Sequence, residues 1–435
     1  MTEPPLPGSP PTPARESRRA VWSWAFYDWA NSVFATTVMA GFFPVFFKQY
    51  WNAGAPVVES TFRLGVANSA ASLAVLMLAP LLGALADRLR WRKGLLAVFA
   101  LLGIVMTAGL YFVGQNEWHL AALLYGLAVL GFAGANLFYD ALLVVVAGRA
   151  DMDRLSALGY ALGYLGGGLL FAVNVLMTLY PDWFGLDSRA QAVRVSFLTV
   201  ALWWAVFSVP LLLFVREPAR GAVRGPGRPL SDSLRRLLQT LREVGHLPQA
   251  FLFLGAYWLY IDGVDTVIRM AVDYGMSLGF PSNSLIVALL ITQFVGFPAA
   301  IACGWLGARI GAKTAILFGL AVYIGVTLQG VFMTHVWQFY LLAVLVGLVQ
   351  GGVQSLSRSM YARLIPAQRA GEFFGFYNML GKFAAVLGPA LMGGVALLTG
   401  SPRLSILSVV VLFLAGGGLL LAVDPSRGER DAARQ

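Results

Sequence analysis

The chain has 435 residues, of which 58% are hydrophobic and 12% are charged, and its formal net charge is +10. A soluble globular protein carries about 25% charged residues, so this composition excludes an ordinary soluble fold. The apolar runs are also much longer than the roughly ten-residue alternating strands of an outer-membrane barrel. The sequence therefore predicts an all-α polytopic membrane protein.

The first predicted element is a Pro-rich polar segment, residues 1–20, which we interpret as a disordered cytosolic tail. Hydropathy then predicts twelve transmembrane helices, each long enough to cross a bilayer. A polar linker at 216–249 separates a six-helix half at 21–215 from a second half at 250–423, and a cytosolic tail occupies 424–435. The predicted helices are 21–47, 61–86, 93–114, 118–148, 155–180, 190–215, 250–275, 283–307, 311–333, 337–362, 371–399 and 403–423.

The linker carries seven arginines and a run rich in glycine and proline between Gly221 and Pro229. After this run, leucines recur at helical spacing between Ser231 and Val244, and the opposite face is basic. The pattern predicts a short amphipathic helix on the inner leaflet, either as a passive surface element or with a regulatory role.

Basic residues fall mainly on one side of the predicted membrane. Of the 31 lysines and arginines, 23 lie in the tails, the linker and the loops between helices 2–3, 4–5, 8–9 and 10–11. The opposite set of loops holds five. The positive-inside rule therefore predicts that both termini are cytoplasmic. This distribution explains the net charge without a nucleic-acid partner, and none is expected.

The two halves carry related loops. The loop after the second predicted helix reads Gly83-Ala-Leu-Ala-Asp-Arg-Leu-Arg-Trp-Arg-Lys93, and the loop after the eighth runs from Gly304 to Lys313. Both resemble the loop signature of the major facilitator superfamily. The first copy has Arg90 where glycine is usual, and the second has Ala308 in place of the aspartate.

A finer resemblance rests on the run Tyr27-Asp28-Trp-Ala-Asn-Ser32 together with Gln354-Ser-Leu-Ser-Arg358. These residues resemble the branch of the superfamily that contains the fungal autophagy-related vacuolar amino-acid effluxers and their bacterial relatives. The resemblance implies the major facilitator fold, with twelve helices in two pseudo-symmetric halves and helices 1, 4, 7 and 10 lining a central cavity. It also implies export of amino acids or similar solutes, across the plasma membrane in a bacterial cell.

Three of those four cavity helices contain an acidic residue deep in an apolar run. Asp28 lies in the first helix, Asp140 in the fourth, and Asp262 and Asp265 in the seventh. An aspartate there costs about 2.5–3.5 kcal/mol on insertion scales, so it marks a functional-site candidate. Desolvation disfavours the charged form of a carboxyl, which suits a proton carrier.

Each acid has neighbours that define its predicted role. Asp28 is flanked by Tyr27 and Asn31, which can bind substrate or the carboxylate itself, and we predict that Asp28 is the better proton carrier. Asp262 is predicted to bind substrate or a lysine. Asp265 either joins it in this site, since the i,i+3 spacing places both on one face, or pairs with Arg269.

Four charged residues are predicted to form a cytoplasmic gate: Asp87, Arg88, Asp140 and Arg358. Asp87 can cap a neighbouring helix or pair with a loop arginine. Aligning Asn136 with the glutamine at 354 places Asp140 opposite Arg358, so these two are expected to form an ion pair when the cytoplasmic side is closed. The alternative is that Arg358 extends to the inner leaflet.

Lys382 lies deep in the eleventh helix, where it should face water, an acid or an anionic substrate group. Tyr377 and Asn378 lie about one turn away and complete the predicted binding residues. The glycines at 159, 163 and 167 have the spacing of helix packing rather than of a nucleotide site. Three widely separated histidines predict no metal site, and no cofactor is expected.

We therefore predict a secondary active transporter, and not an enzyme, that moves amino acids or similar small polar solutes by alternating access. Export and proton coupling are the leading expectations, with the proton as coupling ion. The alternatives are an uncoupled facilitator or uptake carrier, or a flippase for lipids or amphiphiles. The expected form is a monomer, surrounded by lipid in the bacterial plasma membrane.

Overall fold

The computed structural model describes residues 18–55, 63, 66, 70, 73–75, 77–79, 81–87, 91–217, 247–400 and 402–434. The described part of the chain folds into helices and contains no strand. Ten described helices are long and apolar enough to cross a membrane. The proposed amphipathic helix of the linker, the segment before Arg18 and the side chain of Arg88 lie outside the described residues.

The first half begins with α1 (Arg18–Val33), which continues through η1 (Phe34–Phe42), α2 (Phe43–Phe46) and η2 (Phe47–Trp51) as one span. An apolar helix at Leu73–Asp87 represents the second predicted span. The remaining helices of this half are α4 (Arg92–Gly109), η3 (Leu110–Phe112), α5 (Trp118–Val146), α6 (Met152–Leu179), η4 (Pro181–Phe184) and α7 (Arg189–Phe214).

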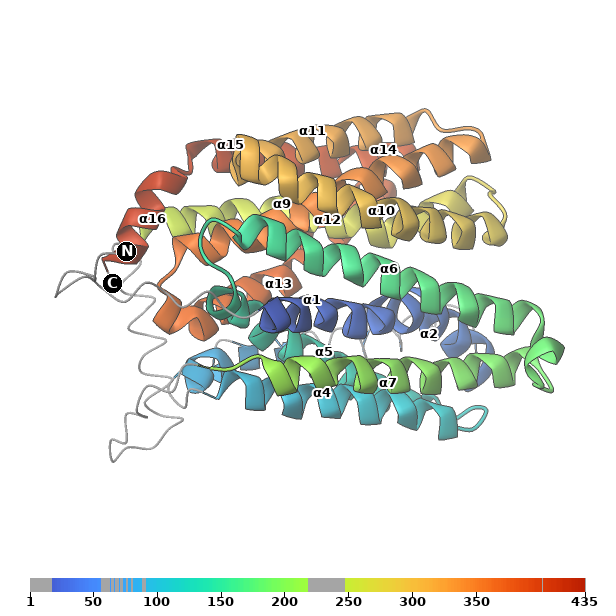
Figure 1. The fold of residues 1–435 in the computed structure, drawn as a ribbon. Coiled ribbons are helices and arrows are strands. Elements are labelled where there is room, and N and C mark those ends of the chain that lie inside the picture. The colour runs from blue at the N-terminus through green and yellow to red at the C-terminus, as the bar shows by residue number, and fades with distance from the viewer. Residues whose placement is uncertain are drawn as a thin grey trace.

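The second half contains the helices from α9 to α16. They are α9 (Pro248–Ser277), α10 (Ser282–Ile310), α11 (Ala312–Val331), α12 (Val336–Leu364), η6 (Ala367–Arg369), α13 (Ala370–Thr399), α14 (Pro402–Leu407), α15 (Val409–Ala422) and α16 (Pro425–Ala433). The blue-to-green and yellow-to-red helices of Figure 1 run along one common direction as two adjoining bundles. Helix α6 of the first half packs on α10 and α12 of the second.

Several elements differ from their sequence-based bounds. Helix α1 begins at Arg18, inside the segment expected to be a tail, and its span continues to Trp51 with two π-helical stretches. The proline of α2 lacks an N–H, so the regular hydrogen-bond pattern cannot continue through it. The last predicted span is broken at Ser408, whose hydroxyl donates to the carbonyl of Ser405. The C-terminal tail contains α16, and its N-cap residue, Asp424, accepts through its side chain from the backbone N–H of Arg427.

The lysine that ends each repeated loop has the same structural role in both halves. Lys93, near the start of α4, donates to the carbonyl of Val215 at 2.9 Å, where α7 ends. Lys313, near the start of α11, donates to the carbonyls of Leu421 and Val423 at 2.8 Å, where α15 ends. Each cation thus satisfies carbonyl groups left without a partner at a helix C-terminus. Glu217 accepts from the backbone N–H of Lys93, and burial raises the pKa of this glutamate.

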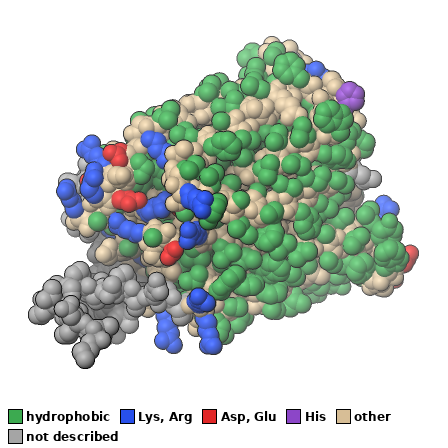
Figure 2. Space-filling model, turned by 45° about the horizontal axis from the view of Figure 1, so that its top comes forward, with side chains coloured by type: hydrophobic (Ala, Val, Ile, Leu, Met, Phe, Trp, Pro, Cys, Tyr) green, Lys and Arg blue, Asp and Glu red, His purple; other side chains and the backbone are tan. Residues whose placement is uncertain are grey.

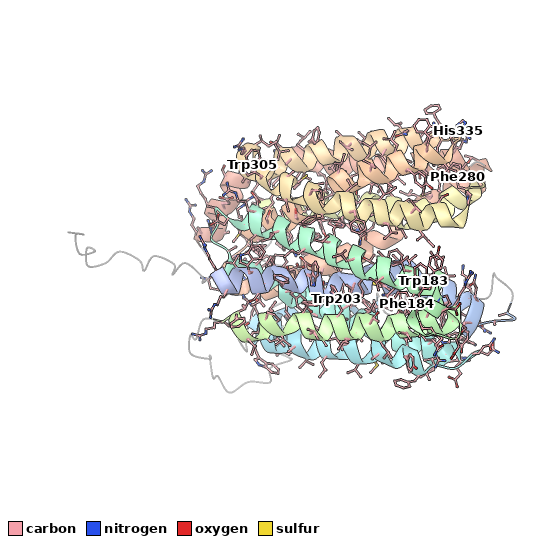
Figure 3. All side chains as sticks on the ribbon, turned by 45° about the vertical axis from the view of Figure 1, so that its right-hand side comes forward. Trp183, Phe184, Trp203, Phe280, Trp305 and His335 are labelled. Carbon is pink, nitrogen blue, oxygen red and sulfur yellow. The ribbon has the colours of Figure 1, made fainter. Side chains whose placement is uncertain are left out.

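The outer surface is suited to lipid. Large apolar side chains such as Leu101, Leu202 and Phe318 are more than half exposed along the sides of the bundle. Figure 2 shows that lysines and arginines gather at one end of the molecule, which we call the basic end. Helices α4, α6, α9, α11 and α13 begin there, and α16 lies there in Figure 1. Exposed aromatic side chains mark both ends in Figure 3, with Trp305 at the basic end and Trp183 at the other, as expected for interfacial belts.

Candidate functional site

The centre of the candidate site is Arg358, on the last third of α12. This stretch is buried on nearly every face, and Arg358 is only 2% exposed. A guanidinium in such a place is costly unless it is paired and hydrogen-bonded. Its partners come from the other half of the molecule.

Two carboxylates hold the Arg358 guanidinium. Its Nη1 atom lies 3.1 Å from Oδ1 of Asp140 on α5 and 3.4 Å from Oδ2 of Asp28 on α1. Its Nη2 atom also lies 3.4 Å from Oδ2 of Asp28. The Tyr139 hydroxyl donates to the same Asp28 oxygen at 2.9 Å, and the Asn378 side chain donates to Oδ2 of Asp140 at 3.2 Å. Three helices thus place two acids around one cation.

Helix α6 supplies the remaining polar contacts. The Nε atom of Arg358 donates to the Ser156 hydroxyl, and Nη2 donates to the Ser156 carbonyl, both at 2.9 Å. The Ser156 hydroxyl in turn donates to the carbonyl of Ser355. The absence of a side chain at Gly159 is required here, because a Cβ atom would lie 2.6 Å from the Asp28 carboxylate. Three aromatic rings, from Trp24, Tyr139 and Tyr160, lie 4.5 to 5.2 Å from the guanidinium carbon.

A second layer of contacts between the halves lies nearer the basic end. Asp87 forms an ion pair with Arg92 at 2.6 Å. The Asp87 carboxylate also accepts from the backbone N–H groups of Gly371 and Glu372, at 3.0 and 2.8 Å, in the first turn of α13. A carboxylate here satisfies orphan donors and interacts favourably with the helix dipole. Asp87 therefore attaches the first half to the start of α13.

The same layer contains an ion pair that the sequence did not single out. Asp153 of α6 accepts from Arg363 of α12 through both carboxylate oxygens, at 2.9 to 3.1 Å. Arg363 also lies 3.4 Å from Glu429 of α16. The predicted fifth span begins at residue 155, which places Asp153 in a loop. In the structure Asp153 is the second residue of α6, because this helix begins at Met152.

Ser156, Tyr160, Trp24 and Tyr139 were also not predicted as site residues. A helical-spacing signal existed for them, since Trp24 precedes Asp28 by four residues and Ser156 precedes Tyr160 by four. The orientation of these faces toward Arg358 depends on the tertiary packing.

The other predicted residues lie around this centre or away from it. Tyr27 is fully buried and packs on Tyr139, with ring centroids 5.1 Å apart, and the Asn31 side chain donates to Asn136. Tyr377 stacks on the ring of Tyr257 at 4.1 Å. Asn378 joins the Arg358 cluster by a hydrogen bond to Asp140.

Asp262 has a separate location inside the second half. It is fully buried, and both of its carboxylate oxygens accept from the backbone N–H of Gly388, at 3.0 and 3.1 Å. A Cβ atom at position 388 would lie 1.8 Å from the Thr266 hydroxyl, so glycine permits this close approach. Asp265 is partly exposed on the same helix. The side chains of Lys382 and Arg269 lie outside the described residues, so the predicted pairing of Lys382 with Asp262 stays a prediction.

Among the described residues, no group of three or more potential ligands could hold a metal ion.

The charged and polar contacts of Asp87, Asp140, Asp153 and Arg358 join the two halves at the basic end. Farther from this end, the Gln293 side chain donates to the Thr36 hydroxyl. The described conformation is therefore closed at the basic end.

Comparison with known families and proteins gives consistent matches. A family model described as "Vacuole effluxer Atg22 like" matches residues 16–63 and 58–433. An uncharacterized MFS-type transporter, YxiO of Bacillus subtilis (strain 168), is 37% identical over 95% of this chain and 96% of its own length. Autophagy-related protein 22-1 of Penicillium rubens is 28% identical over 64% of this chain. The match spans about half the length of that fungal relative.

Solved structures show the same fold at low sequence identity. The human organic anion transporter MFSD10 (TETRAN) has a TM-score of 0.69 and 18% identity, covering 95% of this chain and all of that one. The proton:xylose symporter XylE has a TM-score of 0.69 and 14% identity, with 93% and 94% coverage. These likenesses confirm the predicted all-α polytopic fold of the major facilitator type.

Proposed function

Because the chain belongs to the vacuole effluxer Atg22-like family of the major facilitator superfamily, we propose that this secondary transporter exports amino acids or similar small polar solutes in exchange for protons. Efflux is suggested by the name of the family. The observation that carries the mechanism is the buried cluster in which Arg358 of one half is held by Asp28 and Asp140 of the other.

The cluster supports alternating access for a simple electrostatic reason. In the closed conformation, two carboxylates share one guanidinium out of water. When the halves separate at the basic end, Arg358 moves with α12, and the two carboxylates remain with α1 and α5. They then need another positive charge, which a proton or a cationic group can supply. Binding at the cluster is thereby linked to the conformation of the transporter.

In this scheme Asp28 is the proposed proton carrier. Its carboxylate receives a hydrogen bond from Tyr139 and contacts both terminal nitrogens of Arg358. Loss of Arg358 on opening removes two of these three contacts at once. A proton that reaches Asp28 from the side opposite the basic end would replace the lost positive charge and permit the gate to open. The proton would leave on the cytoplasmic side when substrate binds, so solute export is coupled to proton entry.

The second layer, nearer the basic end, is proposed as the part of the cytoplasmic gate that must break first. Its contacts are those of Asp87 with the start of α13, and of Asp153 with Arg363. The concentration of lysine and arginine at this end supports a cytoplasmic location for it and for both termini. For a bacterial chain the membrane would be the plasma membrane, and a monomer would suffice because both halves of the pathway belong to one chain.

The test is transport in proteoliposomes with an imposed pH gradient, using a panel of radiolabelled amino acids. The wild-type protein should accumulate at least one of them against its gradient. Asp28→Asn removes the titrating group and keeps the shape of the side chain. The variant should no longer accumulate substrate in response to the pH gradient. It should retain part of the exchange of internal for external substrate.

Asp182→Asn is the matched control, because Asp182 is an exposed aspartate in η4, at the end away from the basic residues. It should behave as wild type. Accumulation driven by the pH gradient in Asp28→Asn would eliminate Asp28 as the carrier. Wild-type movement that ignores the pH gradient would instead favour an uncoupled facilitator, and scrambling of labelled lipid would favour a flippase.

A further inference from the structure

The residues around Arg358 form a complete binding site on one half of the protein. We call it the guanidinium cage and define it by six residues: Trp24, Asp28, Tyr139, Asp140, Ser156 and Tyr160. They lie on α1, α5 and α6, all in the first half. The group inside the cage comes from α12 in the second half. The cage and its occupant therefore belong to the two bodies that must separate during transport.

The polar groups of the cage match a guanidinium in detail. Nε donates to the Ser156 hydroxyl, Nη1 contacts both carboxylates, and Nη2 contacts the Ser156 carbonyl and the Asp28 carboxylate. All three nitrogens of the planar group are thus bound by acceptors at 2.9 to 3.4 Å. An ammonium has one nitrogen and cannot satisfy acceptors spread over this fork.

The aromatic members complete a cage of the type that recognises organic cations. The guanidinium carbon lies 4.5 Å from the ring centroid of Tyr160, 5.0 Å from that of Trp24 and 5.2 Å from that of Tyr139. Trp24 and Tyr139 stack on each other at 4.4 Å, and the Trp24 indole N–H donates to the carbonyl of Tyr139. These two rings are held in place by each other, so they do not need Arg358 to keep their positions.

We propose that the guanidinium cage binds a guanidinium group of the transported solute when Arg358 withdraws, so that Arg358 is a tethered substitute for the substrate. The proposal rests on the transport function proposed above and deepens it by naming the substrate class. The two carboxylates attract the cation, the serine groups and rings select its planar form, and Arg358 displaces it when the basic end closes. A proton on Asp28 competes with the same cation, which makes the two occupants alternate.

The first experiment measures substrate recognition by the wild-type protein. Proteoliposomes are loaded with arginine, and uptake of labelled arginine by exchange is challenged with unlabelled arginine, lysine or citrulline. Citrulline has nearly the shape of arginine but a neutral urea group. The expected order of competition is arginine, then lysine, then citrulline, with citrulline at least about tenfold weaker than arginine, because a charge-assisted hydrogen bond is about twice as strong as a neutral one.

Two variants assign the recognition to the cage. Tyr160→Leu removes one ring and should weaken arginine competition about 2- to 30-fold, the range of a cation–π contact from exposed to desolvated sites. Asp140→Asn should weaken arginine more than citrulline, because it removes charge and keeps a polar group. Tyr180→Leu and Asp182→Asn are matched controls on residues at the far end, and both should leave the order and affinities unchanged.

The second experiment does not depend on transport. Arg358→Ala empties the cage, and its thermal stability is measured in detergent with millimolar arginine or citrulline. Arginine should raise the melting temperature of this variant and citrulline should not. If Arg358→Ala does not fold, Arg358→Met fills part of the same volume and serves for the same measurement.

The outcomes separate the two proposals. Equal competition by arginine and citrulline, with transport of other amino acids intact, would overturn the cage and leave the transport function standing. A folded Arg358 variant that arginine does not stabilise would overturn the cage as well. Wild-type protein that moves no amino acid would overturn the transport function. In that case, an Arg358 variant that is stabilised by arginine and not by citrulline would still support the cage.

Discussion

Replacing Arg358 with alanine should shift the protein from the closed conformation toward one that is open at the basic end. The substitution removes the guanidinium and leaves Asp28 and Asp140, which are 9% and 8% exposed, facing each other without their cation. Opening of the basic end gives both carboxylates access to water. The variant should therefore favour the open state, whereas wild-type protein favours the closed one.

The expected size of the shift follows from the burial of the cluster. Breaking a buried ion pair by removal of one partner costs about 3–5 kcal/mol, because an uncompensated charge stays in the low dielectric. Each 1.4 kcal/mol changes an equilibrium constant about tenfold. Even the lower limit, about 3 kcal/mol, would shift the closed-to-open equilibrium more than about 100-fold. Arg358→Lys keeps the positive charge but loses the planar, multi-donor guanidinium group. Its shift of the closed-to-open equilibrium should therefore be smaller than that of Arg358→Ala.

Cysteine accessibility measures this shift. Cys303, the single cysteine of the chain, is first replaced by serine. A cysteine is then introduced at Ser355, which is fully buried beside Ser156 in the closed gate. Its reaction with a maleimide should be at least about tenfold faster with Arg358→Ala than without it, since the rate follows the open population.

Unfolding would also expose Ser355→Cys, so a second reporter is required. Thr107→Cys lies in the core of α4 within the first half, where the threonine is fully buried and donates to the carbonyl of Gly103. Its labelling should stay slow in the Arg358→Ala background. An unchanged labelling rate at Ser355→Cys, with Thr107→Cys protected, would refute the inference that the cluster stabilises the closed state.

Three further predictions concern the ion pair, the close contact at Gly388 and the orientation in the membrane. Exchanging the charges, Asp140→Arg with Arg358→Asp, should restore more transport than either single change, because the three-charge balance is kept; equal loss in all three variants would contradict it. Gly388→Ala should lower the melting temperature by several degrees, because overpacking of this kind costs about 1–3 kcal/mol. Gly394→Ala, with no atom within 4 Å of its new Cβ, should be neutral or stabilising, and an equal loss in both would count against the close contact at 388. A cysteine at position 228 should resist an impermeant reagent in intact cells, and rapid labelling there would reverse the proposed orientation.

The sequence alone was sufficient to predict the fold and to identify the charged residues that lie inside apolar spans. Hydropathy is a property of each segment against lipid, so length and composition predict spans such as 118–148 and 190–215 without knowledge of their neighbours. The same argument singles out Asp28, Asp140 and Arg358, since a charge in an apolar run is costly wherever the helix packs.

The partners of those charges were decided by the tertiary structure. Asp28 and Arg358 are 330 positions apart, and their contact depends on the rotation of α1 and α12 and on how the two halves meet. Asp153 became a gate residue because α6 begins before it and aims it at Arg363. Asp262 of α9 accepts a hydrogen bond from the backbone N–H of Gly388 in α13, because these two helices approach closely there. Insertion cost acts on one helix at a time, whereas pairing requires atoms of several helices to meet, and that geometry is set only when the bundle is packed.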